Sequence, residues 1–182
     1  MKDLVWSYNL KNHNDIKSNL LDTFKVTEKR IEKNDLDSIT YTDFRNNNHH
    51  TERPYFATFA NILDDFAKDF MSYYCVENFT ITNCWFQQYY KNDNHSWHNH
   101  GQTNISWVYY VELNDKNYNT EFYDTTKKQK FTLDVKEGDI VVFPSFIPHR
   151  SPAIVTNDRK TIISCNVNLL DIDTNLMNID VV

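Results

Sequence analysis

The chain has 182 residues, of which 40% are hydrophobic and 15% aromatic, and its formal net charge at pH 7 is −6. This length and composition predict one packed globular domain, residues 1–182, rather than a disordered chain. The negative charge provides no general field that would attract nucleic acid. No apolar run approaches the roughly 20 residues of a membrane span, and the first residues lack the apolar core of a signal peptide. The sequence therefore predicts a cytoplasmic protein that acts on a small molecule or a peptide and has no nucleic-acid or membrane partner, with the oligomeric state left open.

Cysteine and glycine are both scarce. Cys75, Cys84 and Cys165 are an odd number without a short paired spacing, which predicts buried free thiols. With only two glycines, the chain cannot form a glycine-rich dinucleotide-binding loop or a phosphate-binding loop. The two that are present, Gly101 and Gly138, both lie beside the histidine motif described below.

The first 80 residues are predicted to be mainly helical. Asn14 or Asp15 can cap a short helix in which Ile16, Leu20 and Phe24 share one face.

A stronger helix is predicted over residues 54–76. It begins at Pro54, because proline is tolerated in the first turn of a helix. Its apolar side chains recur every three or four residues, which predicts a face packed on a sheet rather than a cofactor-binding surface. These residues are Phe56, Phe59, Ala60, Leu63, Ala67, Phe70, Met71 and Tyr74.

From about residue 79 the pattern becomes typical of strands. Segments rich in β-branched and aromatic residues occupy 83–90, 105–113, 131–135, 140–143 and 160–169. Many short strands that follow a helical segment predict a mainly β fold, a sandwich or barrel of roughly eight strands with the N-terminal helices packed outside (α+β). The barrel is expected over residues 81–170, followed by a C-terminal tail over 171–182.

Three histidines form a candidate metal site. His98 and His100 are separated by one residue, so on a strand they point to the same face about 6.5–7 Å apart at the Cα atoms. Gly101 then lets the chain turn without a side chain. His149 follows a segment that two prolines stiffen and is the expected third ligand. His95 is interpreted as an ordinary surface histidine.

The order and spacing of several motifs resemble the iron(II)/2-oxoglutarate oxygenases. The resemblance is strongest to a branch found in bacterial and phage genomes that reads H-x-H where most of the superfamily reads H-x-D, and it covers about residues 83–168. The motifs are Trp85-Phe86-Gln87-Gln88-Tyr89, His98-x-His100, Ser106-x-Val108-Tyr109-Tyr110, Gly138 to Ser145, His149, Arg159 and Ile163-Ser164-x-Asn166.

This resemblance implies a double-stranded β-helix, the jelly-roll or cupin-like barrel, that holds iron(II) through His98, His100 and His149. It also implies an oxygenase that uses 2-oxoglutarate as co-substrate, hydroxylates a small-molecule or peptidyl substrate and releases succinate and CO2. Ascorbate is an auxiliary reductant that the resemblance allows.

The resemblance places an arginine for the distal carboxylate of 2-oxoglutarate at Arg159. A planar guanidinium can bind a carboxylate through two hydrogen bonds, which lysine cannot do. Thr161 would share the face of Arg159 and add a hydroxyl donor, and Tyr89 is expected to line the pocket. Arg150 is the competing arginine, but its adjacency to His149 on an extended segment predicts that it points the other way.

The histidine at position 100 departs from the usual carboxylate. A neutral imidazole leaves the site about one charge more positive and changes its metal preference. If His100 does not bind the metal, Glu112, Glu121 or Asp124 would have to supply a carboxylate.

Two other classes of protein remain open. A three-histidine cupin also fits the spacing of Gly138, Pro144 and His149, although cupins carry a glutamate where this chain has residues 104–105 and a glycine where it has Phe146. A non-enzymatic jelly-roll binding module would explain the strands without the histidines. The primary substrate is not identified by any motif.

Overall fold

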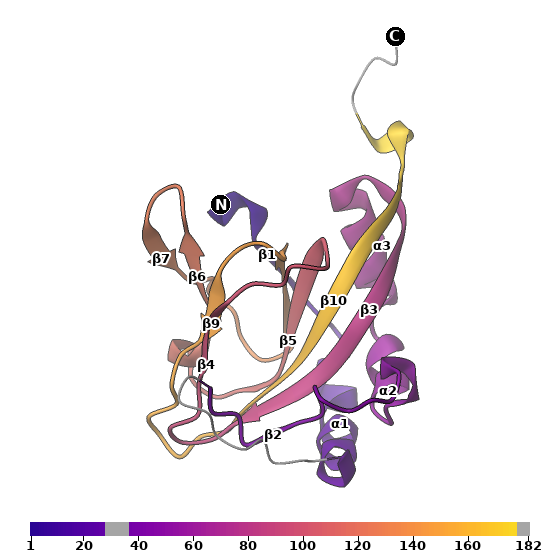
Figure 1. Cartoon of the computed structure of the whole chain (residues 1–182). Coiled ribbons are helices and arrows are strands. Elements are labelled where there is room, and N and C mark those ends of the chain that lie inside the picture. The colour runs from indigo at the N-terminus through magenta and orange to yellow at the C-terminus, as the bar shows by residue number, and fades with distance from the viewer. Residues whose placement is uncertain (28–36, 178–182) are drawn as a thin grey trace.

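The computed structural model describes residues 1–27 and 37–177, which form two antiparallel sheets with helices on one side (Figure 1). The α-helices are α1 (His13–Thr27), α2 (Phe56–Ala60) and α3 (Asp64–Tyr74), and short 3-10 helices are η1 (Lys2–Leu4), η2 (His50–Glu52), η3 (Lys116–Tyr118) and η4 (Thr174–Leu176). The strands are β1 (Trp6–Asn9), β2 (Tyr41–Thr42), β3 (Val76–Tyr89), β4 (His95–His98), β5 (Ile105–Leu113), β6 (Glu121–Asp124), β7 (Gln129–Phe131), β8 (Asp139–Pro144), β9 (His149–Ser151) and β10 (Lys160–Ile172).

The strand order is that of a jelly roll. The larger sheet has the order β1-β8-β5-β10-β3-β2, and the smaller sheet has the order β4-β9-β6-β7. Between β3 and β10 the chain passes repeatedly from one sheet to the other, so strands far apart in sequence become neighbours. The predicted mainly β jelly-roll fold with helices packed outside is confirmed.

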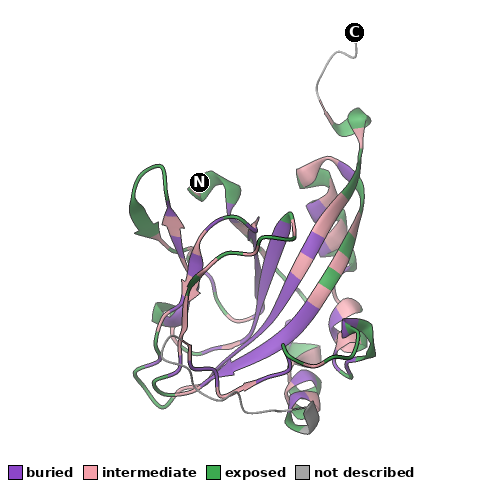
Figure 2. Cartoon of the chain, in the orientation of Figure 1, coloured by how far each residue is buried: buried purple, intermediate pink, exposed green. Residues whose placement is uncertain are grey.

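The long strands β3 and β10 separate two hydrophobic cores. Because side chains alternate along a strand, Phe86 and Ile163 face the helices, whereas Tyr89 and Ile162 face the smaller sheet. Figure 2 shows that the C-terminal part of β3, nearly all of β5 and the N-terminal part of β10 are buried, whereas the N-terminal part of β3 and the C-terminal end of β10 are largely exposed. The space between the two sheets is therefore lined by one alternate set of residues from each strand.

The helical layer packs through the predicted aromatic stripe. Phe59, Phe66 and Phe70 are fully buried, and the rings of Phe66 and Phe70 meet Trp107 of β5 edge-on at 4.9 and 5.0 Å between centroids. The predicted single helix over 54–76 is instead two helices, because the chain turns at residues 61–63 without losing the spacing of its buried side chains. None of the described helices is both long and apolar enough to cross a membrane.

The N-terminal part is not only helical. Residues 6–9 form β1, whose Trp6 pairs with Val142 and whose Asn9 pairs with Asp139 of β8. Four residues are too few to show a strand pattern in the sequence. Their extended conformation is stabilised by pairing with β8. Helix α1 begins at His13, which places the two expected capping residues, 14 and 15, inside the helix.

Other strand boundaries also differ from the sequence prediction. Only residues 129–131 form β7, so most of the segment expected over 131–135 is not strand. The short strands β4, β6 and β9 were not predicted, because three or four residues carry too little alternation to be recognised. Of the expected tail, residues 178–182 lie outside the described part of the chain.

The cysteines are free, as predicted. Cys84 and Cys165 are buried and lie directly opposite each other on β3 and β10, whereas Cys75 is only partly buried.

Candidate metal centre

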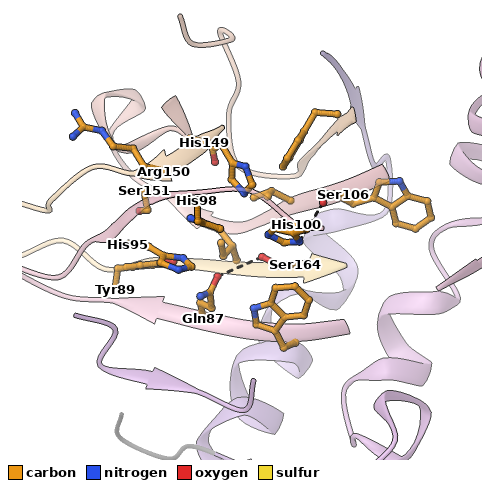
Figure 3. Close-up of a pocket in the computed structure, with 16 residues that line it drawn as sticks. Gln87, Tyr89, His95, His98, His100, Ser106, His149, Arg150, Ser151 and Ser164 are labelled. Carbon is orange, nitrogen blue, oxygen red and sulfur yellow. Dashed lines mark hydrogen bonds between the residues drawn. The ribbon is translucent and has the colours of Figure 1, made fainter. Parts of the chain in front are cut away.

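Three histidines converge between the two sheets. Two lie on strands of the smaller sheet, and the third lies in the loop that follows β4. His98 ends β4 and pairs with His149, which begins β9. His100 lies two residues beyond His98, and one ring nitrogen of each histidine lies within 4.8 Å of the others. Figure 3 shows the three rings directed toward a common point. The strand pairing, together with the H-x-H spacing, therefore brings together the three residues that the sequence proposed.

The hydrogen bonds of these histidines leave one nitrogen of each ring available. For both His98 and His149, Nδ1 lies next to the carbonyl oxygen two residues earlier, at 2.8 and 3.0 Å. A carbonyl oxygen only accepts, so each Nδ1 carries the proton and Nε2 keeps its lone pair. His100 Nδ1 lies 2.5 Å from Oδ1 of Asn166 on β10, which has the same consequence. Outer hydrogen bonds of this kind orient histidines that bind metals.

Burial keeps the three imidazoles neutral. Desolvation lowers the pKa of His98 and His100, and it lowers the pKa of the more deeply buried His149 furthest. The neighbouring histidines add to the shift at His100 and His149, because protonating one ring disfavours protonating the next. Neutral imidazole is the form that binds a metal ion. The donor set therefore fits a divalent transition metal such as iron(II).

The alternative carboxylate ligands have other partners. Glu112 binds Arg159, Glu121 binds Arg150, and Asp124 binds the N-terminal amino group. In the described part of the chain, the one group of side chains placed to hold a metal ion is the three histidines, and none of these three carboxylates belongs to it.

Arg159 lies on the outer face of the larger sheet. Its Nε and Nη2 atoms each donate to the carboxylate of Glu112 at 2.7 Å, which raises the pKa of Arg159. The hydroxyl of Thr161 donates to the same carboxylate. Arg159 and Thr161 thus share a face, as predicted, but neither lines the cavities beside the histidines.

Lys160 points to the opposite side, between the two sheets. Its side chain is 1% exposed, and Nζ donates to the carbonyl oxygen of Tyr118 at 3.0 Å and to the hydroxyl of Ser151. Nζ also lies 4.6 Å from the ring centroid of Tyr89. Among the described residues no carboxylate pairs with this ammonium group. Burial lowers the pKa of Lys160 to about 7.

Strand alternation places Arg159 and Lys160 on opposite faces of the larger sheet. Lys160 shares its face of β10 with Ile162, Ser164 and Asn166, all of which lie on the side of the histidines. Arg159 is one residue earlier, so its side chain points to the opposite face. Ser164 and Asn166 belong to the motif on which the resemblance rests, and counting back from them in steps of two reaches Lys160.

His95 is the site residue that the sequence interpretation missed. It lines both cavities beside the cluster, and its ring stacks on His98 with 3.9 Å between centroids. Burial lowers the pKa of His95 to about 4. A regular strand would place these two residues on opposite faces, but β4 has an irregular register between them. That irregularity cannot be read from the spacing.

Two cavities adjoin the histidines. The first is about 30 Å³ and reaches from the cluster to Tyr89 and Ser151, the residues that contact Lys160. The second is about 530 Å³ and opens on the side of Trp85 and Gly101. Figure 3 shows the residues that line the first cavity. Both cavities are lined by Gln87, His95 and His98, so they meet at the cluster.

No protein-family model matches the sequence, and no curated protein matches it. Solved structures do match over most of the chain. A viral collagen prolyl hydroxylase from Paramecium Bursaria Chlorella virus-1, in complex with 2-oxoglutarate, has a TM-score of 0.63 at 11% identity and covers 92% of this chain and 97% of its own. A prolyl hydroxylase from Trichoplax adhaerens, in complex with a peptide fragment of hypoxia inducible factor, has a TM-score of 0.65 at 11% identity and covers 95% and 85%.

A prolyl-4-hydroxylase from Pseudomonas putida has a TM-score of 0.61 at 12% identity and covers 92% of this chain and 93% of its own. At such low identity these matches concern the fold. The chain therefore has the jelly-roll fold of the 2-oxoglutarate/iron(II) oxygenases, and on that fold it carries a cluster of three histidines, of which His149 is buried and His98 and His100 are partly buried.

Proposed function

We propose that this protein is a non-haem iron(II)- and 2-oxoglutarate-dependent oxygenase. It hydroxylates a small-molecule or peptidyl substrate and releases succinate and CO2. The observation that carries the proposal is the convergence of His98, His100 and His149, each with its Nδ1 occupied and its Nε2 free. The solved structures of the same fold support it, because one contains 2-oxoglutarate and another a peptide.

The three imidazoles are proposed to hold the iron. Three protein ligands on one side of the ion leave further positions for dioxygen and a chelating co-substrate. When bound, iron would activate dioxygen; the four electrons for its reduction come in pairs, from the cleavage of 2-oxoglutarate to succinate and CO2 and from the substrate C–H bond that is hydroxylated. The protein keeps the ligands neutral by burial and holds the ring of His100 through Asn166.

We place the distal carboxylate of 2-oxoglutarate at Lys160 instead of Arg159. A buried ammonium without an anionic partner is costly, and a carboxylate would relieve that cost. Ser151 and Tyr89, which both contact the ammonium, offer hydroxyl groups to the same carboxylate. The cavity here is about 30 Å³, so the side chains between Lys160 and the cluster must move when the co-substrate binds.

The test is an anaerobic titration of the full chain with iron(II) and then with 2-oxoglutarate, followed by the iron-to-oxo-acid charge-transfer band. The wild type should bind one iron and develop the band. His149→Ala should lose stoichiometric iron. Lys160→Met should keep the iron but bind 2-oxoglutarate roughly two to three orders of magnitude more weakly, because the bound carboxylate loses its cation.

Arg159→Gln is the matched control, since it removes the neighbouring cation on the other face and should leave both affinities near those of the wild type. Equal 2-oxoglutarate affinity in Lys160→Met and the wild type would exclude Lys160 as the anchor. Iron binding without any charge-transfer band would replace the oxygenase with a three-histidine cupin. Absence of stoichiometric iron binding would favour the non-enzymatic binding module.

A further inference from the structure

The larger cavity beside the three histidines has space for a ligand other than the co-substrate. Its volume of about 530 Å³ lies within the range of small-molecule sites. It opens onto His98 and His100 from the side of the segment that follows β2. A molecule in this cavity would lie directly against two of the proposed metal ligands.

One wall of the cavity is a row of aromatic rings that leads to the cluster. Phe44 meets Trp85 edge-on at 5.0 Å between centroids, and Trp85 lies 6.0 Å from His100. Trp85 is 4% exposed but Phe44 is 49% exposed. An exposed phenylalanine at the mouth of a cavity offers apolar surface to a bound ligand.

The segment that carries Phe44 is held by buried interactions. Asp43, immediately before it, accepts hydrogen bonds from the hydroxyl of Tyr55 at 2.8 Å and from the backbone N–H of Phe86 at 2.9 Å. Arg53 lies 3.3 Å from the same carboxylate. The backbone N–H of Phe44 donates to the side chain of Thr42 at 3.1 Å. The backbone at residues 43 and 44 is therefore held in place before a ligand arrives, and the exposed side chain of Arg45 extends from the end of this held segment.

Arg45 differs from the other arginines that the structure describes. Arg53, Arg150 and Arg159 each form an ion pair with a carboxylate. Arg45 lines the cavity, and among residues 1–27 and 37–177 it has no ion-pair or hydrogen-bond partner. A guanidinium without a partner beside a substrate-sized cavity is suited to binding an anionic oxygen group of a ligand.

Asp37, which also lines the cavity, is a loop residue held against β4 of the smaller sheet. The Oδ1 atom of Asp37 accepts from the backbone N–H and the hydroxyl of Ser96 on β4, both at 2.8 Å. Arg45, in contrast, follows β2, which pairs with β3 of the larger sheet. An anionic ligand group is therefore favoured on the side of Arg45.

We infer that the primary substrate is a carboxylic acid whose carboxylate binds Arg45 and whose apolar body lies against Phe44 and Trp85. This inference rests on the proposed oxygenase function and specifies its substrate class. In this orientation the far end of the apolar body faces the histidine cluster. The carboxylate can belong to a small free acid or to an acidic side chain of a peptide.

The test compares matched carboxylates and amides as binding probes. Benzoylglycine and benzoylglycinamide represent free small molecules, and acetyl-Phe-Glu-amide and acetyl-Phe-Gln-amide represent peptides. Their dissociation constants are measured by ligand-observed NMR with the full chain, loaded with zinc and saturated with 2-oxoglutarate. In at least one pair the acid should bind about tenfold more tightly than the amide, as expected for a charge-assisted hydrogen bond.

Arg45→Gln should abolish this preference, whereas the charge-matched control Lys68→Gln, on the exposed face of α3, should keep it. Phe44→Ala should weaken acid and amide equally, by about threefold to tenfold. Preference in the benzoyl pair alone identifies a small free acid, and preference in the peptide pair alone identifies an acidic peptide.

The inference is overturned if no probe binds, if acid and amide bind equally in both pairs, or if the preference survives in Arg45→Gln. It is also overturned if Lys160→Met, and not Arg45→Gln, removes the preference, because the acid would then occupy the proposed co-substrate site. A wild type that keeps the acid preference but gives no charge-transfer band would refute the oxygenase while leaving the carboxylate site at Arg45.

Discussion

Arg159 and Lys160 are adjacent cations with opposite environments. Arg159 lies on the outer face and is paired with Glu112, so its charge is already neutralised. Lys160 lies between the sheets, and its partners within residues 1–27 and 37–177 are neutral groups of Tyr118, Ser151 and Tyr89. As the residue that binds the distal carboxylate of 2-oxoglutarate, arginine is favoured by residue type, because a guanidinium is the better carboxylate ligand. Lysine is favoured by the direction of its side chain, which points between the sheets.

The lowered pKa of Lys160 predicts a pH dependence of stability. In the folded protein the pKa is about 7, below its ordinary value of 10.5. Between these values the unfolded chain binds more protons than the folded chain, so the free energy of unfolding should rise with pH from about 7 upward. Lys160→Met should remove this contribution, at most about 1.4 kcal/mol per pH unit. The variant should therefore gain stability relative to the wild type at neutral pH and below.

Urea unfolding of both proteins at intervals between pH 6 and pH 9 measures this effect. Arg159→Gln is the control and should keep the slope of the wild type in this range. If the slopes of Lys160→Met and the wild type coincide, the ammonium is not desolvated as the structure indicates.

At the scale of the element, the short strands determine which histidines lie side by side. The irregular register of β4 brings His95 to the side of His98, and the pairing of β4 with β9 brings His98 to His149. On the other side of the cavity, β2 has only two residues, and the buried carboxylate of Asp43 holds the segment that follows it.

The Asp43–Arg53 pair yields a prediction about that segment. Both side chains are at most 3% exposed, and burial raises the pKa of Asp43 despite the guanidinium nearby. Arg53→Met would leave a buried carboxylate without its cation, which costs about 3–5 kcal/mol. A lower urea midpoint with an unchanged transition slope is the expected result.

Lys25→Met is the control, because Lys25 pairs with Asp22 on the exposed face of α1 and both side chains are more than half exposed. Its free energy of unfolding should change by no more than about 0.5 kcal/mol. If the free energy of unfolding fell by similar amounts in Arg53→Met and Lys25→Met, the buried pair would not contribute more to stability than an exposed pair.

At the scale of the whole molecule, the larger sheet separates a core packed against the helices from a second core, beside which the histidines lie. The helices and their aromatic stripe cover one face, and the histidines, Lys160 and both cavities adjoining the histidines lie at the other. Stability and metal binding should therefore be separable by mutation.

Phe70→Ala tests this separation. Phe70 is fully buried between α3 and the sheet, against Trp107. Removing its ring should lower the free energy of unfolding by about 3–5 kcal/mol, through lost burial and the cavity left behind. Iron stoichiometry of the folded variant should stay at that of the wild type. The measurements are urea unfolding and metal analysis after purification at low temperature.

Lys68→Ala, on the exposed side of the same helix, should change neither quantity noticeably. Loss of iron from folded Phe70→Ala protein would show that the two faces of the sheet are coupled.

Much of this organisation could be predicted from the sequence. The change of period near residue 79 predicted helices followed by a jelly roll, because burial imposes a period of about 3.6 on helices and of 2 on strands. The spacing of His98, His100 and His149 proposed the metal ligands, because residues two apart on a strand share a face. These are local properties, and local properties are visible in a sequence.

The tertiary structure decided the rest, because it depends on which strands become neighbours. Pairing with β8 made residues 6–9 a strand, and the irregular register of β4 brought His95 into the site. The pairing of β10 with β3 and β5 fixed which of its alternate side chains point between the sheets. Lys160 points there, and Arg159 points to the outer face. A shift of one residue in that register would exchange their faces. The sequence alone determined which residues could do the chemistry, and the long-range pairing of strands determined which of them face it.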